Sequence, residues 1–333
     1  MTEGADSEEL LMTPEAAIDD MYKRCFRLSL GRLQELKDSG RKLAHYTTAE
    51  NGLKIIQSKT IWLRNAALMN DFSEIEHGRA CLTWTLQNTD LFQRLTALVE
   101  PHHPGLCQEV LQWLNNVDLN ARLFTYMTAL SEHAADDETG RLSMWRAYGG
   151  SAAGVAFVMN TDFLDVDDSQ LQAVTSPVLY GGPQKLAQEM AGMVDALTEA
   201  PDLVKAVPAP NAKSILFNAF RYAILSTKHP SFEEEQEWRI LYAPRDEASA
   251  FIEEEPVSIR GIAQLAYKLP LENKPGLNMP HVEIDRLLHR LIIGPTQFPY
   301  AVAEAYDEAL KRAGVKDGGQ RIKISHIPLR HTG

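Results

Sequence analysis

Short apolar segments alternate with polar turns along most of the chain, and their spacing switches between the two-residue period of strands and the longer period of helices. Apolar segments of strand length predict strands at residues 42–46, 60–64, 124–131, 154–159, 174–180, 236–242, 263–269, 291–295 and 321–330. Apolar residues at helical spacing predict helices at residues 14–36, 49–58, 74–120, 143–149, 183–228, 285–290 and 301–314. The stretch 74–120 is expected to break near 101–105, and the stretch 183–228 near 201–210. Because no regular strand–helix–strand repeat is present, the pattern favours the α+β class over a doubly wound parallel sheet.

The same pattern predicts how the chain is organised. Residues 1–40 are predicted as an N-terminal extension, disordered over the first dozen residues and then helical from Pro14, which suits the first turn of a helix. Residues 41–333 are predicted as a single α+β domain with helical insertions near 73–120 and 183–228.

Polar residues indicate where two helices begin. Thr47 or Thr48 suits the N-cap of the helix that follows the first strand. Asp71, followed three residues later by Glu74, has the form of a capping box. A turn and a helix cap are therefore the simplest interpretation of these two residues and of Asn70.

Composition limits the class of protein. The 333 residues include 45 Asp and Glu against 33 Lys and Arg, which gives a net charge of −12. The overall electrostatic field therefore does not favour binding of nucleic acid, although this argument does not apply to a local basic groove. Cys25, Cys81 and Cys107 fit no disulfide or metal framework and are interpreted as reduced thiols. The N-terminus lacks the features of a signal peptide and no apolar run has the length of a membrane span, so we expect a cytoplasmic protein without a membrane partner.

The motifs of common cofactor sites are missing. The glycines within 149–154 follow a helix and precede a strand, the reverse of the order in a dinucleotide-binding loop, and no phosphate loop is present. His102, His103 and Cys107 match no common zinc spacing and lack a fourth ligand. We therefore predict no metal site.

An acidic segment that leads directly into a strand is the most informative local feature. Glu233, Glu234, Glu235 and Glu237 occupy four of five positions, and like charges this close repel one another. The two-residue period places Glu235, Glu237 and Arg239 on one face of the strand. The alternative interpretation is a surface ion pair beside a solvated turn. Glu237→Gln keeps the shape of the side chain and removes its charge at a strand entry that is expected to be partly exposed. The change is therefore predicted to abolish any activity, to leave the fold intact and to change stability by less than about 1 kcal/mol.

Sequence blocks at 45–78, 130–157, 228–241, 291–295 and 324–330 lie in one order along the chain and span residues 42–330, nearly its whole length. They include the acidic strand entry, the Asn70–Asp71 pair before Glu74 and the segment 143–149 around Trp145. This combination resembles the uncharacterised bacterial family known as domain of unknown function 2971. The family name implies no activity.

A second resemblance is to the ADP-ribosyltransferase fold, which implies a split mixed β-sheet core with flanking helices. It rests on an early strand that ends in His-x-Thr and a late strand entered through Glu-x-Glu. The resemblance implies that His45, with Tyr46 and Thr47, anchors NAD, and that Glu237 holds the nicotinamide ribose with Glu235 as the flanking acid. A hydrogen-bonded structural histidine is the alternative for His45.

The resemblance implies further contacts with NAD. Trp145 and Tyr148 are the candidates for stacking on nicotinamide, although core packing is the alternative because the two residues are three apart on a short helix. Asn65 either lines the pocket or ends a strand. Arg239 is expected to keep Glu237 ionised. The Ser-Thr-Ser and Tyr-x-x-x-Tyr forms of known groups are missing.

These features predict an NAD-dependent ADP-ribosyltransferase or NAD glycohydrolase, with NAD as a substrate and His45 and Glu237 in one cleft. The expected setting is a toxin or antiviral defence system, with a protein or nucleic-acid acceptor and a partner protein both unidentified. The alternative is a non-catalytic binding or sensor module whose acidic segment docks a partner. A third option, an enzyme that acts on RNA, requires a basic groove.

Overall fold

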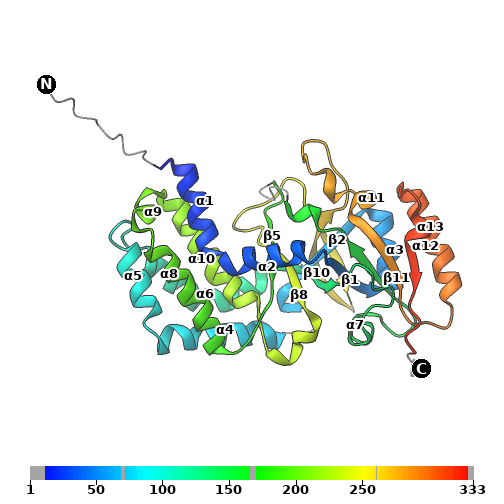
Figure 1. Ribbon diagram of the computed structural model, residues 1–333, viewed down its shortest axis with the longest axis horizontal. Coiled ribbons are helices and arrows are strands. Elements are labelled where there is room, and N and C mark those ends of the chain that lie inside the picture. The colour runs from blue at the N-terminus through cyan, green and yellow to red at the C-terminus, as the bar shows by residue number, and fades with distance from the viewer. Residues whose placement is uncertain (1–11, 69–71, 166–169, 260, 329–333) are drawn as a thin grey trace. The chain divides into compact units, whose positions relative to one another are not determined.

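The computed structural model describes residues 12–68, 72–165, 170–259 and 261–328 (Figure 1). The chain forms two compact units, each built from three segments. We call them the helical unit, Met1–Gly31, Ile75–Val117 and Gly181–Thr227, and the sheet unit, Arg32–Glu74, Asp118–Tyr180 and Lys228–Gly333. The two predicted insertions coincide closely with the second and third segments of the helical unit. The disorder predicted for the first dozen residues falls almost entirely on 1–11, outside the described residues.

The helical unit packs amphipathic helices on one another. Its helices are α1 (Pro14–Cys25), most of α4 (Phe72–Asn88), α5 (Leu91–Val99), the start of α6 (Leu106–Phe124), α8 (Pro183–Thr198), α9 (Pro201–Ala206) and α10 (Ala209–Leu225). Pro14 occupies the first turn of α1, as predicted, and the Thr13 hydroxyl caps the helix by accepting from the Ala16 N–H at 3.3 Å. Helix α1 buries Ala17 and Met21 where it packs on α8, α9 and α10.

The sheet unit contains a mixed sheet that has ten strands in the described residues. Eight strands lie in the order β12, β11, β4, β1, β3, β2, β10 and β9, and β8 pairs with β3 while β5 pairs with β8. All neighbouring strands are antiparallel except β11 and β12, which are parallel. Their bounds are β1 (Lys42–Thr48), β2 (Thr60–Asn65), β3 (Tyr126–His133), β4 (Gly154–Met159), β5 (Ala173–Pro177), β8 (Glu237–Tyr242), β9 (Glu253–Ile259), β10 (Ile262–Pro270), β11 (Leu288–Ile293) and β12 (Ile322–Ile324). The predicted α+β class is confirmed.

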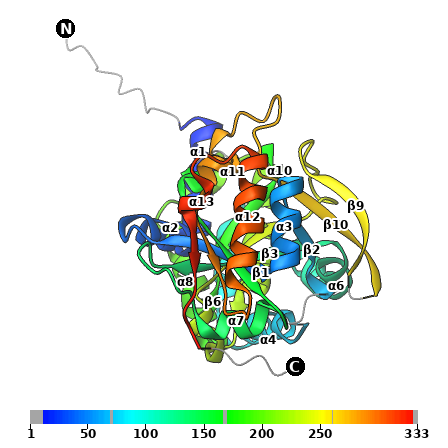
Figure 2. The ribbon, with the colours of Figure 1, turned by 90° about the vertical axis from the view of Figure 1, so that its right-hand side faces the viewer.

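Helices cover both faces of this sheet. Helices α3 (Ala49–Ser58) and α12 (Pro299–Ala313) lie side by side on one face, where the Tyr306 hydroxyl donates to the Ala49 carbonyl at 2.6 Å (Figure 2). The short helix α7 (Leu142–Tyr148) packs on the other face against Tyr46 and Ala156. The remaining short elements are α2 (Arg27–Asp38), η1 (Ala66–Leu68), η2 (Asp162–Asp165), β6 (Leu179–Tyr180), β7 (Thr227–Lys228), η4 (Pro230–Glu235), η5 (Pro280–Val282), α11 (Ile284–Leu287) and α13 (Gly318–Arg321).

The sheet divides at β3. Strand β8 pairs with β3 from Tyr126 to Ser131 along one edge. The other edge is shared, because β2 pairs with Tyr126 and Met127 whereas β1 pairs with Ser131, Glu132 and His133. Strands β1 and β2 therefore leave the same edge of β3 at its two ends.

The strand registers fix which residues share a face. Ala44, Ser131 and Glu237 form one row across β1, β3 and β8, so their side chains point to the same side of the sheet. Trp238 and Ile240 point to the other side and join the main core. The face with Glu237 is thus also the face that α7 covers.

Trp145 forms the centre of a second, smaller core beneath α7. Its ring is 2% exposed and meets Tyr46 edge to face, with 4.8 Å between the ring centroids. The indole N–H donates to the Thr139 carbonyl at 3.0 Å. Gly294 lies directly against the ring, because a Cβ at that position would stand 2.7 Å from Trp145 Cε3.

Three secondary-structure predictions were wrong. The helix predicted at 285–290 ends at Leu287, where β11 begins, because the following residues join the sheet beside β4. The closing strand predicted at 321–330 is limited to Ile322–Ile324 within the described residues, since only these pair with β11. Strand β9 was not predicted because its acidic start and exposed surface hide the strand pattern. In addition, no helix among the described residues combines the length and apolarity needed to cross a membrane.

We expect Gly294→Ala to destabilise the protein by about 1–3 kcal/mol, because the added methyl group overpacks a rigid ring that has no room to move. Gly31→Ala is the matched control, since its Cβ enters open space on α2 and the change should stabilise that helix by about 0.5–1 kcal/mol. Urea unfolding followed by circular dichroism measures both. Equal effects of the two substitutions would contradict the packing around Trp145.

Candidate functional site

The acidic segment forms a tight turn before β8. Glu233 and Glu234 are exposed, as expected for solvated charges, whereas Glu235 is half-buried. Gln236 then adopts a left-handed backbone conformation with φ of 44°, which is uncommon for a residue with a Cβ, and its carbonyl accepts from the Glu132 N–H at 2.9 Å. The strand begins at Glu237, so a strained residue separates the two predicted catalytic glutamates.

Lys228 gathers three carboxylates around one buried ammonium group. Its Nζ lies 3.0 Å from Glu235 Oε2 and 3.2 Å from Glu237 Oε2, and it contacts Glu74 Oε1. The Lys228 side chain is almost fully buried. We call Glu74, Lys228, Glu235, Glu237 and Arg239 the carboxylate cluster. All five belong to the sheet unit.

Arg239 completes the cluster from the same face of β8. Its Nε donates to Glu237 Oε1 at 2.8 Å, and its Nη2 donates to Glu237 Oε2 at 3.1 Å and contacts Glu74 Oε2. The predicted same-face pairing of Glu237 and Arg239 is confirmed. Both side chains are buried, however, with Glu237 7% exposed, so the expectation of a partly exposed Glu237 was wrong. Residues far away in sequence enclose the pair, and local periodicity does not reveal them.

The charges of the cluster do not balance, because three carboxylates face two cations. Burial raises the pKa of Glu237, but Arg239 and Lys228 outweigh burial and hold that pKa below its ordinary value. The pKa of Glu74 is raised to about 7, mainly by burial and also by repulsion from Glu237, whereas the charge of Arg239 lowers it. The carboxylates hold the pKa of Lys228 above its ordinary value despite burial. Of the three carboxylates in the cluster, Glu74 is therefore the one that is protonated most easily.

Two aromatic residues that sequence reasoning missed border the cluster. The Tyr180 hydroxyl accepts from the Glu237 N–H at 2.7 Å, and burial raises the pKa of this phenol. The Phe232 ring is 40% exposed, and Lys228 Nζ lies 4.7 Å from its centroid. Neither residue stands in a recognisable motif, and the only signal for Phe232 is its place inside the acidic segment.

Arg141 anchors the acidic turn to the sheet. Its Nη1 donates to the carbonyls of Glu234 and Glu235 at 2.9 and 3.0 Å and to Ser131 Oγ at 3.1 Å. Its Nη2 donates to the Glu132 carbonyl at 2.5 Å. The Ser131 hydroxyl also donates to the Glu235 carbonyl. These bonds fix the backbone that carries the two glutamates.

His45 lies apart from the carboxylates. It follows Ala44 on β1, and alternate strand residues point to opposite faces, so the register places His45 on the face opposite to Glu237. Its Nδ1 lies 3.0 Å from the Ala129 carbonyl, where β1 leaves β3, and burial lowers its pKa. The register therefore gives no support to a shared cleft.

The remaining predicted NAD-binding residues are spread over several environments. Tyr46 and Trp145 are enclosed in the small core, where Tyr148 packs against them half-buried. Thr47 is half-buried on β1. Asn65 is buried at the end of β2, where its Oδ1 accepts from the Ala67 N–H at 2.9 Å.

Two helix-cap predictions have different outcomes. Of the two candidates on β1, Thr48 is the N-cap of α3, because its hydroxyl accepts from the Asn51 N–H at 3.3 Å. Asn70 and Asp71 lie outside the described residues, so the capping box stays a prediction. Glu74, the other half of that box, contributes its carboxylate to the cluster.

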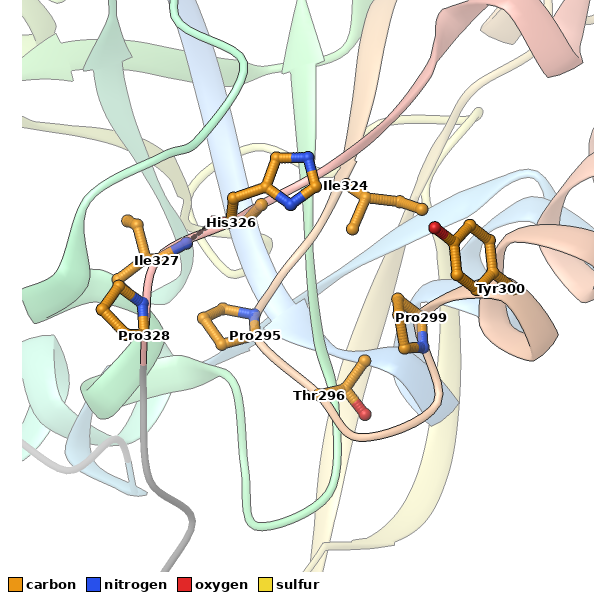
Figure 3. Close-up of a pocket in the computed structure, with 9 residues that line it drawn as sticks. Pro295, Thr296, Pro299, Tyr300, Ile324, His326, Ile327 and Pro328 are labelled. Carbon is orange, nitrogen blue, oxygen red and sulfur yellow. Dashed lines mark hydrogen bonds between the residues drawn. The ribbon is translucent and has the colours of Figure 1, made fainter.

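A surface pocket of about 300 Å³ lies elsewhere on the sheet unit, and Figure 3 shows Tyr300 and His326 among its lining side chains. Prolines form much of its wall, and none of the sequence-predicted site residues lines it. Strongly perturbed ionisable groups are more typical of functional sites than shape alone. The carboxylate cluster is therefore the better candidate.

Replacing Glu237 by Gln should cost about 1–3 kcal/mol of stability, because Arg239 and Lys228 would lose their bonds to a buried carboxylate while Glu74 and Glu235 still face them. The exposed Glu233→Gln control should change stability by less than about 0.5 kcal/mol. Urea denaturation gives both values. A cost below about 1 kcal/mol for Glu237→Gln would contradict a buried ion pair.

Glu74 should make stability fall as pH rises from about 5 to about 7.5. Its folded-state pKa of about 7 exceeds the ordinary 4.5, so the folded state holds the extra proton and loses that advantage on ionisation. The loss is on the order of 2–3 kcal/mol.

Denaturant unfolding at several pH values tests this dependence against Glu74→Gln, in which the fall due to Glu74 should be missing. The pKa of His45, His133 and His289 is lowered by burial, which gives the opposite slope, but that contribution is common to both proteins and cancels in the comparison. Parallel profiles would rule out Glu74 as the source.

Comparison with known proteins adds a family but no activity. No curated protein matches the chain, and no solved structure matches it. The matched family segment begins in α7 and ends in β8, so it contains four of the five cluster residues and leaves out Glu74. Residues 144–240 match the model of the family described as Protein of unknown function (DUF2971), which confirms the resemblance to that family over this segment.

Proposed function

We propose that the protein is an NAD-using enzyme that transfers or hydrolyses the ADP-ribosyl group, with the carboxylate cluster as its centre. The observation that carries the proposal is the gathering of three carboxylates around Lys228 and Arg239. Cleavage of the bond between nicotinamide and ribose develops positive charge on the ribose, as in glycoside hydrolysis. A fixed anion stabilises that charge without reorganisation.

The two predicted catalytic glutamates take different roles in this proposal. The Glu235 side chain is 18% exposed, so it is the carboxylate that a substrate ribose meets. Glu237 is buried and bonded to Lys228 and Arg239, so it acts as a positioning residue that keeps Glu235 and Lys228 in place.

The arrangement of strands supports the comparison with ADP-ribosyltransferases. A split sheet is expected for that fold, and β1 and β2 leave one edge of β3 at its two ends. Strand β8, entered through Glu235 and Glu237, lies on the other edge. NAD is the proposed substrate, and a protein, a nucleic acid or water is the acceptor. A toxin or antiviral defence system remains the proposed setting.

A second candidate function is a non-catalytic docking or sensor module. It is favoured by the exposure of Glu233 and Glu234 beside the partly exposed ring of Phe232. Such a surface suits a basic partner, whose binding weakens as salt screens the charges.

NAD turnover by the purified protein, with and without a cell lysate, separates the two functions. We expect Glu235→Gln to lower turnover about 10²- to 10³-fold because it removes the fixed anion. Glu233→Gln and Glu234→Gln should leave turnover within about twofold, since both residues are exposed and a Gln oxygen can still accept the hydrogen bond that Glu234 receives from Ser143. A small, similar effect of all three substitutions, or turnover at background level in the unmodified protein, would contradict the enzyme and favour docking.

A further inference from the structure

Two arginines from different segments meet at one amide oxygen. Arg41, just before β1, and Arg141, just before α7, each direct an Nη2 at Gln236 Oε1, at 2.6 and 2.5 Å. The two nitrogens are therefore no more than about 5 Å apart, a distance at which like charges repel one another. A neutral amide does not cancel that repulsion.

One buried carboxylate lies beside this pair. Glu132 is shared, since its carboxylate lies 2.8 Å from Arg32 Nη2 and 3.4 Å from Arg41 Nε. Within the described residues, the hydrogen-bond partners of the Arg141 side chain are all neutral oxygens. The exposed Glu35 pairs with Arg32 at 3.2 Å.

Two further ionisable residues lie near Arg141. Burial lowers the pKa of His133, and the charges of Arg141 and Arg290 lower it further. The Asp137 carboxylate accepts from the Thr139 N–H at 2.8 Å and lies 3.8 Å from His133 Nε2. The oxygen at which Arg41 and Arg141 meet is thus neutral, although the chain carries a net charge of −12.

We propose that Arg41 and Arg141, with Arg32 at the rim, form a binding site for a phosphate group, whose oxygens would take the place of the Gln236 amide oxygen. Guanidinium forks match phosphate geometry and bind it through two parallel hydrogen bonds. Arg41 is 34% exposed, and among the described residues its Nη1 has no hydrogen-bond partner, so a ligand reaches it from solvent. The ligand class is a diphosphate or phosphodiester, and the site does not require that NAD be turned over.

Isothermal titration with inorganic pyrophosphate, at ionic strength held constant with NaCl, tests the site directly. The unmodified protein should bind, and Arg41→Met should weaken binding at least about tenfold by removing a charged donor. Lys54→Met, in an exposed ion pair with Glu50 on α3, is the control and should bind as the unmodified protein does.

A substitution of Gln236 distinguishes ligand binding from a purely structural role of the arginines. Gln236→Gly suits the left-handed backbone and removes the competing amide, so pyrophosphate should bind equally well or more tightly. Loss of binding in Gln236→Gly, equal binding by Arg41→Met, or absence of binding at millimolar pyrophosphate would each overturn the proposal. If Arg41→Met does not fold, Arg32→Met at the exposed rim should also weaken the binding of pyrophosphate.

The source of the phosphate is resolved by competition. ADP and a short single-stranded RNA are added separately to the pyrophosphate complex of the unmodified protein. The natural ligand class is the one that displaces pyrophosphate there and binds weakly to Arg41→Met. Displacement by ADP indicates a nucleotide, and displacement by RNA indicates an RNA backbone. Because this readout is binding, it holds or fails separately from NAD turnover.

Discussion

The structure around the acidic segment depends on one buried ammonium group. Removing Lys228 from water is costly, and three carboxylates repay that cost only because each is held at contact distance. The same requirement fixes where β8 starts, because Glu235 and Glu237 must both reach Lys228. A left-handed residue between them is the local consequence, and its strain is maintained by the bonds from Arg141 and the Glu132 N–H.

Buried ion pairs and perturbed pKa values occur in structural networks as well as in functional sites, and the carboxylate cluster has both features. Ion pairs that are fully satisfied serve mainly to fix geometry, as Glu237 and Arg239 do. A surplus charge and a carboxyl whose pKa reaches about 7 go beyond that need. These features, together with the partial exposure of Glu235, distinguish the cluster from an ordinary structural network.

Sequence reasoning succeeded where the relevant contacts are local. The two-residue period placed Glu237 and Arg239 on one face, and the threonines before α3 contained its N-cap. It failed where contacts join distant segments, because nothing near Lys228 or Arg141 in the chain indicates which residues they meet. Glu74 is instructive, since its interpretation as a helix cap gives no sign that its carboxylate lies against Lys228 and Arg239.

The distance along the chain between Glu74 and its partners has a consequence for biosynthesis. Glu74 and Arg239 are separated by 165 positions, so a growing chain carries the first carboxylate long before the cations that neutralise it exist. Until then Glu74 must stay hydrated, and the sheet cannot close around it, because long-range pairings form late and slowly. The carboxylate cluster is therefore complete only once β8 has been synthesised, and a chain that ends before β8 lacks it.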